Sequence, residues 1–174
     1  MAPDFFNLSY LAVGSAIQQE GFQVIKNSRI MELLRDHQPV LAGTLPLDLF
    51  IEKSDLDILC CSADLHAVSD LLHKEFSHLK NFKSVLTKVN ETDTLIVQFY
   101  FQGFQFEIFV QPVATRRQTA FLHLMKEFDI LERFPELRIE ILKLKQSGFK
   151  TEPAFAKVLA LPGDPYQAIL NFHI

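Results

Sequence analysis

The stretch LAGTLPLDLFIEKSDLDILC, residues 41–60, places two acids one residue apart in an otherwise apolar run: Asp55 and Asp57. Residues two apart on a β-strand point to the same face, so these two carboxylates are expected to project together. Leu56 and Ile58 then point the opposite way, into a core. Two neighbouring carboxylates repel each other unless a cation lies between them or one of them binds a proton. The stretch therefore predicts a buried strand with a site for a hard divalent cation on one face.

The rest of the chain supplies enough apolar material for one packed domain. It has 174 residues, of which 48% are hydrophobic and 17 are Phe, a composition that argues against disorder. We expect a single domain over residues 1–174, with a sheet-bearing core at about 20–112 and a helical C-terminal subdomain at about 113–174. The net charge is −4, and the basic clusters are short. Duplex nucleic acid is therefore not a favoured partner, whereas a small anionic ligand is.

The sequence carries no sign of a membrane segment. No apolar stretch reaches the length of a membrane span, roughly 18 residues, and the N-terminal segment reads as a helix rather than as a signal peptide. The two cysteines, Cys60 and Cys61, are adjacent. A structural disulfide between neighbours is not expected, and this favours a reducing compartment. We therefore expect a cytoplasmic protein that makes no membrane contact.

The pattern of apolar residues predicts an α/β (α+β) fold, with a mixed sheet in the middle of the chain, flanking helices and a helical C-terminal part. Residues 39–43 and 54–61 are predicted to be strands, and residues 94–112 a β-hairpin. Predicted helices cover residues 6–19, 28–37, 62–79, 115–134, 135–148, 151–161 and 163–172. Their expected caps are Asn27 or Ser28, Ser62, Thr115, Thr151 and Asp164.

The hairpin is the clearest local signal in the chain. Residues 102–103, Gln-Gly, suit a two-residue turn in which glycine takes the positive φ that such turns need. This turn fixes the register, so Phe101 opposes Phe104 and Gln98 opposes Glu107. One face of the hairpin is then wholly apolar and must be covered. Glu107 lies in the middle of the other, mixed face.

Three more residues suit a site that holds a cation together with a phosphate. Glu107 is a lone charge on a central strand, and it faces Asp55 and Asp57 if the hairpin pairs beside their strand. Gly43 and Thr44 follow the preceding strand. A glycine lets a phosphate approach the backbone closely, and the Thr44 hydroxyl and a backbone N–H can donate to phosphate oxygens. Mg²⁺ takes oxygen ligands and is usually shared with substrate phosphates, so this set predicts magnesium and a phosphorylated ligand.

The combination resembles the nucleotidyltransferase superfamily. Its pattern is Gly followed by Gly or Ser, a spacer of roughly ten residues, Asp-apolar-Asp on a strand and a later strand acid. Here the pattern stands as AGT, SDLDIL and FQFEIFV, with Thr44 in place of the usual Ser. The wider text, with QTAFLHLMKE, GFKTEPAFAKVL and GDPY downstream, resembles an uncharacterised bacterial family of unknown function within that superfamily, similar to the minimal nucleotidyltransferases.

This resemblance implies a mixed sheet flanked by helices, with a helical C-terminal part that closes over a nucleotide. It implies that Asp55 and Asp57 bind Mg²⁺, and that Glu107 completes the metal site or acts as a base. It also implies that Gly43 and Thr44 hold the triphosphate. The expected reaction is attack by a hydroxyl of an unknown acceptor on the α-phosphate of a nucleoside triphosphate, with loss of pyrophosphate. The acceptor classes are a small molecule, a protein and an RNA end.

Basic residues in the helical tail are the expected partners of the β- and γ-phosphates. The candidates are Lys143 and Lys150, together with Lys145. Lys150 has a second interpretation, as part of the cap of the helix that follows. His123 sits in an apolar helix, where a buried histidine with satisfied hydrogen bonds is the first expectation and a contact with the nucleotide or acceptor the second.

Other functional classes stay open at this point. The main alternative is a catalytically inactive module that binds a nucleotide or a partner on the same fold. A metal-dependent phosphohydrolase is a third class, for which no water-positioning group is evident. A further set of polar residues, His66, Asp70 and His73, shares one helix face and is expected to be solvated.

Overall fold

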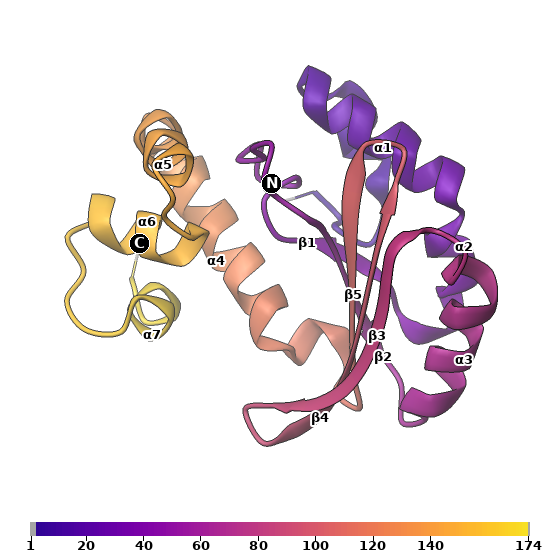
Figure 1. Ribbon diagram of the computed structural model, residues 1–174. Coiled ribbons are helices and arrows are strands. Elements are labelled where there is room, and N and C mark those ends of the chain that lie inside the picture. Colours follow the sequence, from indigo (N-terminus) through magenta and orange to yellow (C-terminus); the bar gives the residue numbers. More distant parts are fainter. Residues whose placement is uncertain (1–2, 174) are drawn as a thin grey trace.

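The computed structural model describes residues 3–173, which form a five-stranded mixed sheet with helices on both faces (Figure 1). The predicted fold class is confirmed. Within these residues no helix is both long and apolar enough to cross a membrane. The strands are β1 Val40–Ala42, β2 Leu56–Cys61, β3 Lys80–Val89, β4 Thr92–Phe101 and β5 Phe104–Gln111. The α-helices are α1 Ala16–Ser28, α2 Ile30–Leu33, α3 Leu65–Phe76, α4 Thr119–Arg133, α5 Leu137–Gln146, α6 Thr151–Val158 and α7 Pro165–Leu170. Short 3₁₀ helices lie at Leu8–Val13, Arg35–His37 and Thr115–Arg117.

The strands lie in the order β1-β2-β5-β4-β3. β2 and β5 run parallel in the interior of the sheet, and β1 pairs antiparallel with β2. On the other side, β4 pairs antiparallel with β5, and β3 with β4. The predicted hairpin register is confirmed, because Phe101 opposes Phe104 and Gln98 opposes Glu107. A local turn therefore determines which face of the sheet Glu107 occupies.

The apolar face of the sheet packs against α1, α2 and α3. Leu56 and Ile58 of β2 are fully buried there, as their alternation with the two aspartates predicts. The rings of Phe99 and Phe106 stack with their centroids 4.9 Å apart, and Phe76 of α3 stacks on Phe99 at 4.5 Å. Burial of one such side chain contributes about 1.5–3 kcal/mol. The Phe-rich hairpin is thus an anchor of this core.

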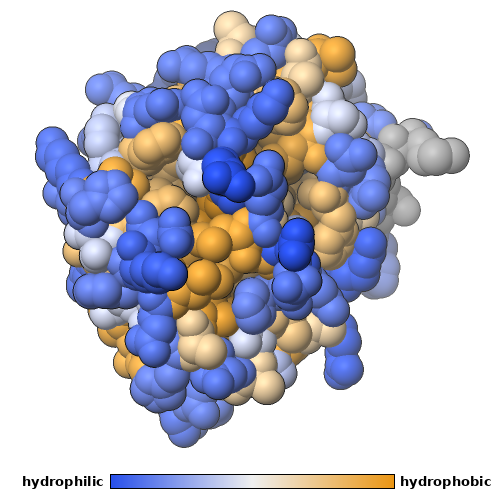
Figure 2. Space-filling model, turned by 90° about the vertical axis from the view of Figure 1, so that its right-hand side faces the viewer, coloured by the Kyte–Doolittle hydropathy of each residue, from blue (hydrophilic) through white to orange (hydrophobic). Residues whose placement is uncertain are grey.

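Figure 2 views the molecule from the side on which α1, α2 and α3 lie, which is the right-hand side of Figure 1. Apolar residues gather in the middle of this view, and hydrophilic residues surround them. Partly buried side chains, among them Met31 and Leu71, pack against the core beneath these helices. The outer layer of this core therefore reaches the surface.

The opposite face of the sheet is covered by the C-terminal helices α4 to α7, on the left of Figure 1. A second core cluster joins Leu59 of β2 to Phe121 and Ile130 of α4 and to Phe155 of α6. This face is not wholly apolar, since it also carries the polar residues of the strands. The second core thus holds the helical part against the face on which the predicted site lies.

The first predicted helix, residues 6–19, is wrong in its bounds. A 3₁₀ helix, Leu8–Val13, is followed by Gly14 and Ser15 in extended conformation, and α1 begins after them. The backbone N–H of Ser15 donates to Oε1 of Gln18 at 3.0 Å, which supports the first turn of α1. Apolar periodicity continues across this break, so the pattern alone merges the two helices.

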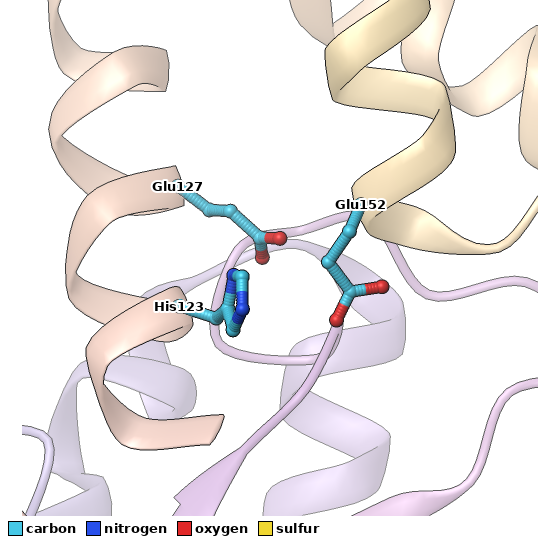
Figure 3. A group of neighbouring side chains, drawn as sticks. All are labelled: His123, Glu127 and Glu152. Carbon is cyan, nitrogen blue, oxygen red and sulfur yellow. The ribbon is translucent and has the colours of Figure 1, made fainter. Parts of the chain in front are cut away.

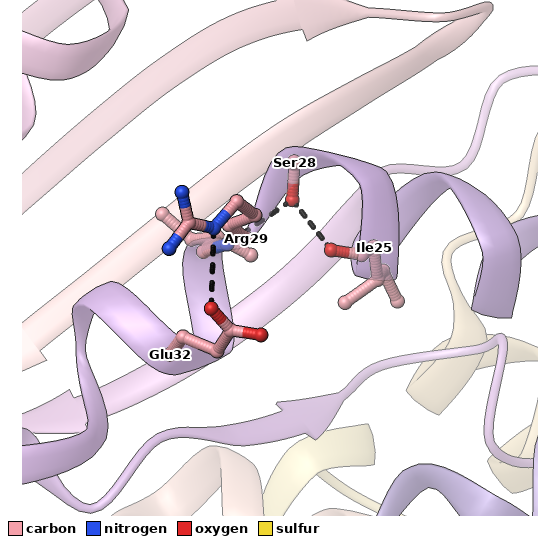
Figure 4. Close-up of polar contacts among 5 residues, drawn as sticks. Ile25, Ser28, Arg29 and Glu32 are labelled. Atoms are coloured by element: carbon pink, nitrogen blue, oxygen red, sulfur yellow. Dashed lines mark hydrogen bonds and ion pairs between the residues drawn. The ribbon is translucent and has the colours of Figure 1, made fainter.

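The second predicted helix, residues 28–37, is interrupted as well. Arg29 has a φ of +57° and separates α1 from α2. Oγ of Ser28 donates to the carbonyl of Ile25 at 2.7 Å and accepts from the backbone N–H two residues later (Figure 4). Nε of Arg29 lies 3.2 Å from Oε2 of Glu32. The Ser28 hydroxyl thus supports the start of α2, but the residue at the cap position is Arg29.

Of the other predicted caps, Asp164 is confirmed, because its carboxylate accepts from a backbone N–H of α7 at 3.0 Å. Asp64, rather than Ser62, caps α3. Thr115 lies in a 3₁₀ helix, and its hydroxyl donates to a backbone carbonyl that precedes β1. Thr151 is already helical, and its hydroxyl accepts from a lysine of α5. Both threonine hydroxyls are therefore used by contacts between elements, which local sequence does not reveal.

The strand β3 is absent from the sequence-based prediction. It forms an edge of the sheet, and most of its side chains are exposed. An edge strand without a buried face lacks the alternation by which strands are recognised. Lys80, Lys83 and Lys88 lie along it, and charged side chains on an edge hinder pairing with another chain.

Candidate active site

The three predicted acids meet on the face of the sheet that α4 to α7 cover. The parallel register of β2 and β5 pairs Asp57 with Glu107, so both carboxylates leave the same face. Asp55 immediately precedes β2 and lines the same pocket as the other two acids. That pocket has a volume of about 510 Å³. The structure therefore brings Asp55, Asp57 and Glu107 together.

The surroundings of Asp55 and Asp57 disfavour negative charge. The pKa of Asp57 is raised to about 8, first by burial and then by the charges of Glu107 and Asp55. Burial and the charge of Glu107 also raise the pKa of Asp55. Nε2 of Gln98 donates to Oε2 of Glu107 at 2.7 Å. Within residues 3–173, no lysine or arginine forms an ion pair with any of the three acids. A divalent cation would relieve this repulsion.

A glycine turn lies directly beside Asp57. Gly43 has a φ of +68°, and a Cβ at this position would collide with Oδ2 of Asp57. The position therefore requires glycine both for its backbone conformation and for this close approach. Thr44 is buried, and its Oγ1 has no hydrogen-bond partner among residues 3–173. Because a buried hydroxyl without a partner is costly, Thr44 is suited to bind an oxygen of a ligand.

The predicted lysines differ in where they lie. Lys145 of α5 is only 6% exposed, and its Nζ donates to Oγ1 of Thr151 at 2.9 Å. Burial lowers its pKa, and the charges of nearby carboxylates oppose this effect. Lys145 and Lys150 both line the 510 Å³ pocket of the three acids. Lys143 is exposed and does not belong to that lining. The positions thus favour Lys145 and Lys150 over Lys143 as partners of a phosphate.

A second group of ionisable side chains lies at the same site. His123 and Glu127 of α4 point toward Glu152 of α6 (Figure 3). Their potential ligand atoms all lie within 4.8 Å of one another. The group lines a pocket of about 280 Å³ together with Gly43 and Asp57. The C-terminal helices therefore contribute polar groups to the space above the acids.

Sequence reasoning identified this second group only in part. His123 was expected to have satisfied hydrogen bonds, and this is wrong, since neither ring nitrogen has a partner among residues 3–173. Burial lowers its pKa. Glu127 is buried, and burial followed by the charge of Glu152 raises its pKa well above the ordinary value. The i, i+4 spacing of His123 and Glu127 is a signal in the sequence, but nothing local connects them to Glu152.

The acids of the sheet fit a magnesium ion. Asp55, Asp57 and Glu107 offer only oxygen ligands, the type that Mg²⁺ prefers. The two aspartates have raised pKa values and no ion-pair partner, and the Thr44 hydroxyl has no hydrogen-bond partner, among residues 3–173. A Mg²⁺ ion with a bound phosphate supplies both.

The same fold occurs in solved structures of larger proteins. Against Cid1, an RNA terminal uridylyl transferase, the TM-score is 0.55 at 14% identity, over 75% of this chain and 41% of that chain. A chain of the GLD-2/RNP-8 complex gives 0.55 at 12% identity, over 81% and 56%. The polymerase core of TRAMP, an RNA surveillance complex, gives 0.52 at 20% identity, over 93% and 50%. The chain spans about half the length of these proteins and has a nucleotidyltransferase-like fold.

Sequence comparison identifies the family. No curated protein matches the chain. The family model described as "Domain of unknown function (DUF4269)" matches residues 23–172. This range includes the whole sheet, the glycine turn, the three acids and the helices that carry His123 and Glu152. The chain therefore belongs to the DUF4269 family of domains of unknown function.

Proposed function

We propose that the chain is a magnesium-dependent nucleotidyltransferase, which moves a nucleoside monophosphate from a nucleoside triphosphate to a hydroxyl of an acceptor. One observation carries this proposal: Asp55, Asp57 and Glu107 meet beside the turn formed by Gly43 and Thr44. A fold shared with an RNA terminal uridylyl transferase supports the same class of chemistry.

In the proposed site, Asp55, Asp57 and Glu107 hold magnesium through their carboxylate oxygens. Bound at these carboxylates, magnesium would supply the positive charge that lowers the pKa of an attacking hydroxyl and offsets the charge of the triphosphate. The hydrogen bond from Gln98 fixes the orientation of the Glu107 carboxylate. Asp57 must lose its proton before it can act as a ligand, so we expect metal binding to release a proton near neutral pH.

The remaining residues position the triphosphate. The missing side chain at Gly43 lets a phosphate approach the backbone, and the Thr44 hydroxyl donates to a phosphate oxygen. Lys145 and Lys150, which line the same pocket as Thr44, contact the β- and γ-phosphates. The acceptor oxygen then forms a bond to the α-phosphorus while the bond to the β-phosphate breaks. Pyrophosphate leaves, and the proton of the hydroxyl passes to a carboxylate or to water.

A thermal-shift measurement with each of the four nucleoside triphosphates, with and without Mg²⁺, tests the binding site. We expect a rise in Tm that requires both ligands and that Asp55→Asn and Asp57→Asn abolish. Glu52→Gln is the matched control, because Glu52 is an exposed acid of the same segment and its replacement should leave the shift intact. The proposal fails if no triphosphate gives a shift that depends on Mg²⁺.

A labelling experiment separates an enzyme from an inactive binding module. The protein is incubated with α-labelled triphosphates and with either cell metabolites or cell proteins and RNA, and both label transfer and pyrophosphate release are measured. Transfer that Asp57→Asn removes supports the enzyme and identifies the acceptor class. A thermal shift without transfer to any of these acceptors would instead favour the module. The net charge of −4 leads us to expect a small-molecule or protein acceptor before a long nucleic acid.

A further inference from the structure

His123, Glu127 and Glu152 have no role in the reaction proposed above, yet they converge on one point. The histidine and Glu127 lie one helical turn apart on α4, and Glu152 reaches them from the first turn of α6 (Figure 3). One ligand atom from each side chain lies within 4.8 Å of the other two. Small rotations of the side chains would place each of these atoms at the roughly 2.0–2.2 Å from a shared metal ion that coordination requires.

Burial makes this convergence informative. The side chains of His123 and Glu127 belong to residues that are only 5% and 4% exposed. Both ring nitrogens of His123 and Oε1 of Glu127 have no hydrogen-bond partner among residues 3–173. Because buried polar groups are almost always hydrogen-bonded, the unpartnered atoms of these two buried side chains indicate a ligand that binds one ring nitrogen of His123 together with the nearby carboxylates.

The chemistry of the three side chains narrows the class of ligand. One imidazole nitrogen and two carboxylates form a mixed nitrogen and oxygen set, which suits Zn²⁺ and other divalent transition metals. Mg²⁺ prefers oxygen ligands only, as in the set formed by Asp55, Asp57 and Glu107. The two groups therefore differ in the metal that they favour, although Asp57 and Glu107 of the first group line the same pocket as the second group.

We propose that His123, Glu127 and Glu152 bind a divalent transition-metal ion, at a site separate from the one formed by the acids of the sheet. The ion links α4 to α6 and fixes the part of the pocket lining that these two helices supply. This inference does not rest on nucleotidyl transfer, because the ligand set exists whether or not the chain turns over a nucleotide.

Lys145 offers a competing explanation for the two glutamates, since an ammonium group can neutralise them. Its Nζ donates to Thr151, however, and within residues 3–173 it forms no ion pair with either Glu127 or Glu152. An ammonium has three N–H donors, and Thr151 already uses one of them, so the remaining two cannot serve His123 and both carboxylates. Lys145 therefore does not account for the unpartnered histidine.

Metal titration of the full-length protein, freed of metal by dialysis against a chelator, tests this site. Zn²⁺ binding is followed by calorimetry and Co²⁺ binding by visible absorption. We expect one tightly bound Zn²⁺ per chain that excess Mg²⁺ does not displace. Glu127→Gln and Glu152→Gln should each weaken its binding at least about tenfold, because loss of even an outer-shell partner costs 10–100-fold.

Two control variants locate the bound ion. His66→Ala tests a His and Asp pair with the same i, i+4 spacing on the exposed face of α3, and it should keep the tight Zn²⁺. Asp57→Asn removes the magnesium set and should also keep it. Equal Zn²⁺ affinity in the wild type, Glu127→Gln and Glu152→Gln would overturn the proposal, as would the absence of a tight Zn²⁺. Glu152 is partly exposed, so Glu152→Gln gives a folded test protein, which circular dichroism verifies.

Discussion

Two groups of side chains lie in adjoining pockets that share Asp57, Glu107 and Glu152 in their linings, and they are built in different ways. We name them the sheet trio and the helix trio; the sheet trio is Asp55, Asp57 and Glu107, and the helix trio is His123, Glu127 and Glu152. The backbone ladder between β2 and β5 sets the spacing of the sheet trio. The spacing of the helix trio depends instead on how α4 packs against the other C-terminal helices. Within the described residues, no backbone hydrogen-bond ladder joins these helices. Local sequence therefore specifies the faces on which the sheet trio lies, and one strand pairing brings its members together. The helix trio instead requires the packing of whole helices.

The two trios also differ in chemistry and exposure. The sheet trio has oxygen ligands only and opens into a pocket of about 510 Å³, which suits a Mg²⁺ ion that arrives with its triphosphate. The helix trio includes an imidazole and two buried residues, which suits an ion that stays bound. This difference suggests that one site serves exchange of substrate and the other serves the rigidity of the pocket wall.

The largest expected effect belongs to the sheet trio. Asp57→Asn should lower the rate of nucleotidyl transfer about 1,000-fold, since a catalytic metal supplies several kcal/mol and each 1.4 kcal/mol is tenfold in rate. The rate is measured as pyrophosphate release with the acceptor that labelling identifies. Glu127→Gln should lower this rate much less, and Glu52→Gln should leave it unchanged. Equal losses in Asp57→Asn and Glu127→Gln would mean that the two trios act as one catalytic centre.

The next effect concerns the contact between the glycine turn and the sheet trio. Gly43→Ala should destabilise the fold by more than the approximately 1–2 kcal/mol that a positive φ costs, because its Cβ also collides with Asp57. Gly163→Ala is the matched control, since Gly163 has a φ of +84° and open space around it. Urea unfolding compares the two variants. Equal losses of stability would show that the turn does not press against Asp57.

A smaller effect distinguishes two lysines of α5. Lys145→Met should weaken triphosphate binding about tenfold, as expected for loss of one charge-assisted hydrogen bond of about 1.5 kcal/mol. Lys143→Met should change it little, because Lys143 is exposed and outside the pocket. Binding in the presence of Mg²⁺ is measured by calorimetry. The reverse order of effects would restore Lys143 as the phosphate partner that sequence reasoning named.

Local rules explain which parts of the fold were predictable. The hairpin register follows from one Gln-Gly turn and from alternation on either side of it, and it places Glu107 without any knowledge of the rest of the chain. The same alternation separates Asp57 from its buried neighbours Leu56 and Ile58. Strand period and turn type therefore made the face of each acid predictable, whereas the meeting of the three depends on the pairing of β2 with β5.

The missed features depend on contacts between distant segments. β3 has few buried side chains, so its sequence lacks the alternation of apolar and polar residues that would predict a strand paired with β4. Thr115 and Thr151 resemble helix caps, but their hydroxyls bind other elements. Glu152 joins His123 only after α6 packs near α4. The bacterial origin, the likeness to the minimal nucleotidyltransferases, the cytoplasmic location and the domain division near residue 112 stay predictions.

An effect similar in size to that of Lys145→Met is expected in the pH dependence of stability of the metal-free protein. The folded-state pKa of Asp57 is raised from 3.8 to about 8, so the folded chain keeps a proton that the unfolded chain releases above about pH 4. The stabilisation from this proton is complete at low pH and is lost as the pH rises toward 8. Asp57→Asn should therefore gain stability relative to the wild type between about pH 5 and pH 8. We expect about 1–2 kcal/mol, since each pKa unit is worth about 1.4 kcal/mol and partial exposure of Asp57 reduces the full shift.

Unfolding by urea at a series of pH values, with a chelator present, measures this gain. Some pH dependence should remain in Asp57→Asn, because burial also raises the pKa of Glu127 in the helix trio. The double variant Asp57→Asn/Glu127→Gln should be the least sensitive to pH in this range. If Asp57→Asn leaves the slope of the wild type unchanged, and only Glu127→Gln reduces it, then the proton is held by the helix trio and the sheet trio is solvated enough to stay ionised without a metal.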